Sequence, residues 1–246
     1  MKKTLLALVC TVSASPALAL SINFTGYENN SFFGAEQLEI LNLAAWQYEN
    51  RITDDVTINV TLDTNFTLDM TYPYALAEGG PSWWDVNNVK VTDIAGGSIN
   101  YNVGGNFFGG SFSDYDLYSI TLHELGHILG MVGGSGFAPW DNLLTVNADG
   151  VWFTGEYSVG VYGGLVPITD DLSHWDDSRW TSGINPSMFP TFYPGETRSL
   201  SELDYAALAD MGWHVTFVPE PETWVMLLAG LGVVSSIAAK RRRGAA

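Results

Sequence analysis

Residues 123–127 read His123-Glu124-Leu125-Gly126-His127 and lie inside a segment, 114–129, whose pattern predicts a helix. Residues four apart lie on one face of a helix, so the imidazoles of His123 and His127 can bind the same Zn²⁺. Glu124 then lies near the remaining position of the metal, where a carboxylate can take a proton from bound water. This spacing therefore indicates two zinc ligands and a catalytic general base.

The ends of this helix carry their own signals. Ser113 with Asp116 resembles a capping box, and Gly130 can take the left-handed conformation that ends a helix. One leucine stripe, expected to face the core, consists of Leu122, Leu125 and Leu129.

Other segments show the hydrophobic period of a helix or of a strand, and the two kinds do not alternate regularly along the chain. Helices are expected at 35–50 and 202–211, the second starting at Ser201 with Asp204 and stopping at Gly212. Strands are expected at 56–62, 98–103 and 150–153, and the 98–103 strand could be a sheet edge that accepts a peptide substrate. This mixture indicates an α+β fold.

Catalytic zinc commonly has three protein ligands, so a third is needed. His127 is followed by Gly130 as in the metzincins, which this segment resembles. Most metzincins place the third histidine three residues after that glycine. Here that position is Gly133, which excludes the astacin, serralysin and matrixin patterns.

Two later stretches carry a closer resemblance, Leu172-Ser173-His174-Trp175-Asp176 and Asn185-Pro186-Ser187-Met188-Phe189-Pro190. They resemble the leishmanolysin-type metallopeptidases, as does the closing segment 203–213. The resemblance implies His174 as the third ligand of one catalytic Zn²⁺ and Met188 as the Met-turn residue. It also implies a metzincin-like zincin with a mixed sheet, an active-site helix and a small C-terminal subdomain.

The chain departs from that family in its cysteines. Leishmanolysin-type enzymes carry many disulfides and a propeptide cysteine that blocks the zinc, whereas Cys10 is the only cysteine here. Latency through a cysteine is therefore not expected, and segment 20–34 is too short for a folded prodomain.

The sequence leaves alternatives for the third ligand open. Glu156 or Asp149 could supply an acidic ligand, whereas His214 is expected to be structural. Asp176 and Asp177 could accept hydrogen bonds from a metal-bound histidine, although solvated loop charges are the default interpretation.

The two ends of the chain indicate export. Residues 1–19 have a basic start, an apolar stretch and an Ala17-Leu18-Ala19 cleavage site, which predict a signal peptide. Residues 218–246 combine Pro219-Glu220-Pro221, an apolar run at 223–239 and a basic end.

This tail resembles the PEP-CTERM sorting signal of Gram-negative bacteria. The resemblance implies an exosortase-type partner and a location at the cell surface or in the extracellular matrix. The apolar run is long enough to anchor the chain in the inner membrane, transiently or stably, with its basic end in the cytoplasm.

The body between these ends, 20–217, is strongly acidic. The chain has 27 Asp and Glu against 10 Lys and Arg, and only four of the basic residues lie in the body. Such a charge excludes nucleic acid as a partner and leaves calcium binding possible, although no EF-hand pattern is present.

Together, the histidine motif and the export signals predict an exported zinc-dependent endopeptidase. The alternatives are a metal-stabilised surface or matrix protein without catalytic activity, which would not need Glu124, and a hydrolase of non-peptide bonds.

Overall fold

The structure is a computed structural model that describes residues 19–65, 75–82, 90–107, 110–134 and 136–217. Residues 1–215 form one compact unit and residues 216–246 form another. All but the last residue of the predicted signal peptide, and the whole predicted membrane segment 223–239, lie outside the described residues. Within the described part of the chain, no helix combines the length and apolar character needed to cross a bilayer.

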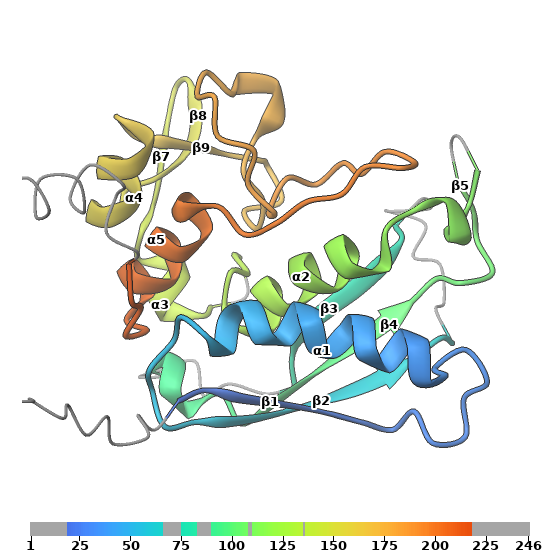
Figure 1. The fold of residues 1–246 in the computed structure, drawn as a ribbon. Coiled ribbons are helices and arrows are strands. Elements are labelled where there is room, and N and C mark those ends of the chain that lie inside the picture. The colour runs from blue at the N-terminus through green and yellow to red at the C-terminus, as the bar shows by residue number, and fades with distance from the viewer. Residues whose placement is uncertain (1–18, 66–74, 83–89, 108–109, 135, 218–246) are drawn as a thin grey trace, which may run out of the picture. The chain divides into compact units, whose positions relative to one another are not determined.

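A four-stranded mixed sheet forms one layer of the first unit (Figure 1). Its strands, in spatial order, are β1 (Ser21–Thr25), β2 (Thr57–Asp63), β4 (Gly96–Tyr101) and β3 (Ala77–Pro81). The first three run parallel, and β3 runs antiparallel to β4. The 98–103 strand was expected as a possible edge, and this is wrong, because β4 lies between β2 and β3. The edge beside β4 is β3.

Helix α1 (Ala35–Glu49) connects β1 to β2 and covers one face of this sheet with α2. The alternation of β2 explains the packing, because Ile58, Val60 and Leu62 are buried while the residues between them are exposed. Tyr48 on α1 is fully buried, and its hydroxyl donates to the Leu122 carbonyl, 2.7 Å away. This bond fixes α1 against the central helix.

The central helix, α2 (Leu117–Ile128), buries ten of its twelve residues. It begins at Asp116, whose carboxylate accepts the Ser119 amide, so the expected cap at Ser113 is wrong. The Ser113 hydroxyl instead bonds that of Ser111, beside a separate 3-10 turn, η2 (Phe112–Asp114). The end agrees with the prediction, because Gly130 has φ +109° immediately after the last turn.

The three-stranded sheet and helix α4 (Glu156–Tyr162) lie on the other side of α2 from the mixed sheet (Figure 1). A three-stranded antiparallel sheet has the order β7 (Leu144–Asn147), β8 (Gly150–Phe153), β9 (Val166–Ile168). The short elements are η1 (Val91–Asp93), β5 (Asn106–Phe107), β6 (Gly110–Ser111), α3 (Ala138–Asp141), α4 (Glu156–Tyr162) and η3 (Asp177–Arg179).

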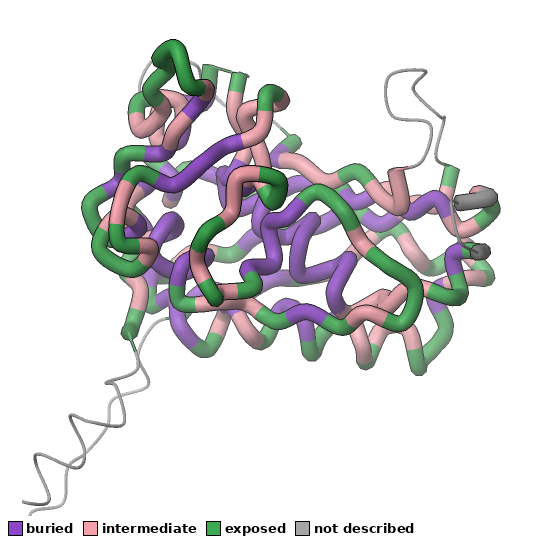
Figure 2. Tube along the Cα trace, turned by 90° about the horizontal axis from the view of Figure 1, so that it is seen from above, coloured by how far each residue is buried: buried purple, intermediate pink, exposed green. Residues whose placement is uncertain are grey.

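The last helix, α5 (Glu202–Met211), starts at Ser201 and stops at Gly212 as predicted. Beyond it, the Trp213 indole N–H donates to the Leu129 carbonyl at the end of α2. Buried residues, purple in Figure 2, run through the interior elements, and exposed residues, green, occupy the connecting turns. The predicted α+β class, with its mixed sheet, is confirmed.

Candidate metal centre

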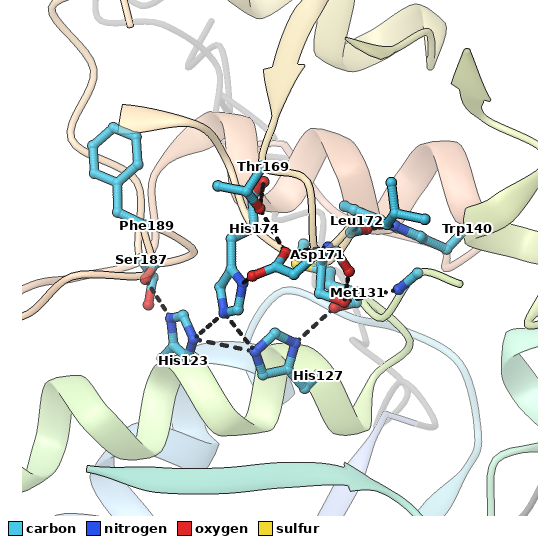
Figure 3. A network of polar contacts seen from close by, with 12 residues as sticks. His123, His127, Met131, Trp140, Thr169, Asp171, Leu172, His174, Ser187 and Phe189 are labelled. Atoms are coloured by element: carbon cyan, nitrogen blue, oxygen red, sulfur yellow. Dashed lines mark hydrogen bonds and ion pairs between the residues drawn. The ribbon is translucent and has the colours of Figure 1, made fainter. Parts of the chain in front are cut away.

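Three histidines from two distant parts of the chain meet at one point (Figure 3). His123 and His127 come from α2, and His174 comes from the segment after β9. Their Nε2 atoms are 3.1, 3.1 and 3.2 Å apart. The histidine expected from the downstream segment thus lies beside the two from the helix.

A tight turn presents His174 to the helix. The Thr169 amide donates to the His174 carbonyl at 3.0 Å, and Ile168 pairs with Trp175 in an antiparallel bridge. Leu172, within the turn, has φ +67°. In this turn the chain reverses direction, so that residues 174 and 175 lie beside the end of β9, and the His174 imidazole points toward α2 (Figure 3).

The other nitrogen of each ring faces an oxygen. Nδ1 of His123 lies 2.9 Å from the Ser187 carbonyl, and Nδ1 of His127 lies 2.7 Å from the Met131 carbonyl. Nδ1 of His174 lies 2.8 Å from a carboxylate oxygen of Asp171. Because these oxygens only accept, each Nδ1 donates a proton to its oxygen, and the Nε2 atom of each ring faces the other two.

Burial keeps the helical histidines neutral. It lowers the pKa of His123 well below its ordinary value and that of His127 to about 3, and the neighbouring imidazoles add to both effects. Nε2 lone pairs that converge at this separation suit a cation bound between them. Nitrogens bound to tetrahedral zinc at about 2.0–2.1 Å are spaced about 3.3 Å apart. The donor set therefore fits zinc in both chemistry and spacing.

Asp171 is the acceptor that sequence reasoning missed. Besides His174, its carboxylate accepts the Thr169 hydroxyl at 2.6 Å and the Ser173 amide at 2.9 Å. Burial alone would raise the pKa of Asp171, but these hydrogen bonds, that of His174 first, hold it below its ordinary value. The sequence shows several aspartates near His174, and only the turn distinguishes Asp171 from the others.

The two carboxylates considered for this role have other partners. Asp176 accepts from Ser178 and forms an ion pair with Arg179. Asp177 opens the short helix η3. Neither carboxylate is the acceptor of a ligand histidine.

Glu124 is 5% exposed and lies against the edge strand β3. Its burial raises the pKa of its carboxyl group to about 8; the Gly79 backbone N–H, which donates to it, opposes this, and the charge of Glu78 adds to it. A β-carbon on Gly79 would lie 2.8 Å from Glu124 atoms. The strand therefore needs a glycine where the acid touches it.

Met188 packs against Gly126, which lies between His123 and His127 in α2. It is 1% exposed, and its sulfur is so close to the helix that a β-carbon on Gly126 would lie 2.5 Å from Sδ. The residue before it, Ser187, provides the carbonyl that holds His123. Met188 thus occupies the place expected of a Met-turn residue, although that role is a prediction.

The alternative ligands lie elsewhere. Nδ1 of His214 is 2.7 Å from the Asp54 carboxylate. Glu156 opens α4, and Asp149 lies in the β7–β8 turn. Across the described ranges, His123, His127 and His174 are the sole group of three or more His, Cys, Asp or Glu side chains placed to hold a metal ion. Calcium binding stays a prediction.

Comparison with known protein families identifies a sorting motif in the tail of the chain. Residues 217–243 match the family model of the PEP-CTERM protein-sorting motif, close to the predicted 218–246. This motif implies export, association with the Gram-negative surface or membrane, and an exosortase-type sorting partner. No curated protein and no solved structure matches the chain.

Proposed function

We propose that this protein is an exported zinc-dependent endopeptidase with a metzincin-like, leishmanolysin-like architecture. One observation carries the proposal: the Nε2 atoms of His123, His127 and His174 converge. Glu124, buried and next to His123 in α2, would then act as the general base. The downstream origin of His174 and the packing of Met188 under α2 support the leishmanolysin-like assignment.

Each residue has a distinct role in the proposed reaction. His123, His127 and His174 would hold the zinc, which when bound makes water a nucleophile near neutral pH and polarises the carbonyl under attack. Glu124 would take a proton from the attacking water at its carboxylate and return it to the leaving amine. The Gly79 amide orients that carboxylate through its hydrogen bond.

The free edge of β3 favours a peptide as substrate. Leu76 and Ser82 hydrogen-bond toward β4, so Ala77 and Gly79 between them direct their backbone groups to the outer side. The Gly79 N–H is taken by Glu124, which leaves the Gly79 carbonyl and both backbone groups of Ala77 for a substrate. An extended peptide could add there as a further strand, up to Pro81, which has no amide hydrogen. The substrate edge expected at 98–103 is therefore reassigned to β3, directly beside Glu124.

Zinc content and casein hydrolysis, measured on the full chain, test this proposal. Wild type should contain about one zinc per chain, as a mononuclear site requires. Glu124→Ala should retain the zinc and lose activity, and His174→Ala should lose both. If Glu124→Ala remained as active as wild type, the mechanism would be wrong.

Other outcomes point to the alternatives. Bound zinc without hydrolysis of any substrate would favour a metal-stabilised surface or matrix protein. Glu124 argues against that function, because a structural zinc site has no use for an adjacent general base. Hydrolysis of esters or non-peptide amides, but not of casein, would instead identify a hydrolase of another bond.

A further inference from the structure

A fully buried carboxylate lies on the first turn of α5. Asp204 is 0% exposed and receives four hydrogen bonds. Its Oδ1 accepts the Trp175 indole N–H at 3.1 Å. Its Oδ2 accepts the Ser187 amide at 2.9 Å, the Ser201 amide at 2.8 Å and the Ser201 hydroxyl at 2.9 Å. The two Ser201 bonds cap the helix, but the other two join segments far from it in the chain.

Those two segments lead directly to the histidines. Ser187 donates its amide to Asp204 and uses its carbonyl to hold Nδ1 of His123. Trp175 follows His174, and its own amide donates to the Met188 carbonyl at 3.0 Å. A single carboxylate therefore fixes the segment that carries His174 relative to the segment that orients His123.

We propose that Asp204 is a positioning residue for the metal centre, which sets metal affinity and ligand geometry without touching a ligand. This inference rests on the proposed function, because it concerns the same three histidines. Both carboxylate oxygens are needed, since four donors point at them. An asparagine would turn its NH₂ group toward at least one of those donors and leave buried N–H groups without an acceptor.

The same helix contains a matched control. Asp210, near the end of α5, also accepts two backbone amides with its carboxylate, those of Tyr157 and Ser158, each at 2.8 Å. These bonds begin helix α4, whose one candidate ligand from the sequence, Glu156, lies outside the group of three histidines. Asp210→Asn thus removes a comparable carboxylate from α5 without reaching the metal centre.

The experiment measures zinc affinity by chelator competition, and the visible spectrum of the Co²⁺-loaded protein, in full-length wild type, Asp204→Asn and Asp210→Asn. Asp204→Asn should weaken zinc binding roughly 10- to 100-fold, as the loss of outer contacts to a metal site typically does, and should alter the Co²⁺ spectrum. Asp210→Asn should leave the zinc affinity and the Co²⁺ spectrum unchanged, even if its thermal midpoint falls as much as that of Asp204→Asn.

Wild-type affinity and spectrum in Asp204→Asn would overturn the inference, as would an equal loss of affinity in Asp210→Asn. If Asp204→Asn fails to fold, Trp175→Phe decides instead, because it removes only the donor to Oδ1 and keeps a ring. That variant should bind zinc less tightly, and unchanged binding would again overturn the inference. Absence of zinc from wild type would contradict the proposed function itself, so the two failures are distinguishable.

Discussion

At the scale of single residues, the clearest contrast is between Gly79 and Gly80. They are adjacent in the edge strand β3, yet a β-carbon on Gly79 would meet Glu124 at 2.8 Å, whereas one on Gly80 would meet nothing within 4 Å. Because the strand pairs with β4 through its backbone, it cannot retreat easily. Added volume at position 79 must therefore displace the side chain or the backbone carbonyl of Glu124.

We predict that Gly79→Ala lowers kcat about 100-fold, the effect expected when a catalytic group moves by about 1 Å. Zinc content should not change, because the three atoms nearest to the added methyl group all belong to Glu124, which is not a proposed ligand. Gly80→Ala is the control and should stay within about twofold of wild type in kcat, a change well below one factor of ten in rate. Steady-state hydrolysis of a peptide measures both, and an active Gly79→Ala enzyme would contradict the assigned role of Glu124.

Asp171 gives a second prediction at this scale. In Asp171→Asn, the amide cannot offer one oxygen to His174 and another to Thr169 and Ser173, as the carboxylate does. Zinc affinity should fall roughly 10- to 100-fold. Chelator competition measures it, with Asp170→Asn, an exposed neighbour, as the unaffected control. Equal affinities in the two variants would show that Asp171 does not support His174.

Residue patterns predicted the histidines but not their supporting acceptor. His123 and His127 follow from helical periodicity alone, and His174 followed from resemblance to a family. Near His174 lie several aspartates, and Asp171 is selected only by a turn in which Leu172 has φ +67°. A non-glycine residue in that conformation is uncommon, so no local pattern announced the turn.

At the scale of elements, α2 depends on the absence of a side chain at Gly126. Alanine inside a helix normally stabilises it by about 1 kcal/mol relative to glycine. Here its methyl group would lie 2.5 Å from the Met188 sulfur, and overpacking a core costs about 1–3 kcal/mol. The clash should exceed the gain in helix propensity.

We therefore predict that Gly126→Ala lowers the free energy of unfolding by up to about 2 kcal/mol, the overpacking cost less the propensity gain. Met188→Ala also destabilises, by leaving a cavity, but together the two changes should cost less than their sum. Urea denaturation of the four proteins provides the double-mutant cycle. Strict additivity would mean that the two residues do not contact each other.

The elements predicted correctly are those with local signals. The span of α1, the strand 150–153 and the capped α5 follow from periodicity and end residues. The edge strand β3 reads Ala-Glu-Gly-Gly-Pro, a composition that disfavours strands and that pairing with β4 overrides. Helix α4 lies in a glycine-rich region, and its first amides are held by Asp210, about 50 residues away in the sequence. A cap supplied from that distance leaves no local signal.

At the scale of the whole molecule, a bound metal would connect the two sides of α2. Two proposed ligands belong to the helix that covers the mixed sheet, and the third belongs to the segment after β9. An ion that binds only the folded chain stabilises it by mass action, about 4 kcal/mol at a free concentration of 1,000 times Kd.

Zinc removal should therefore lower the thermal midpoint of the protein by several degrees. Calorimetry with and without chelator measures the difference. Glu124→Ala should show the same drop as wild type, because it retains all three ligands. His174→Ala should show a much smaller one, and a full drop in that variant would assign the metal to other residues.

Asp204 and Trp213 lie near the end of the body, and this position affects when the site can form during export. A secreted chain crosses the membrane from its N-terminus, so α5 is the last element of the body to emerge, immediately before the matched tail. Until then, Ser187 and Trp175 have no carboxylate to join them, and α2 lacks the indole that contacts its end. The proposed peptidase would thus complete its site only after export, which would delay proteolysis until the chain has left the cell.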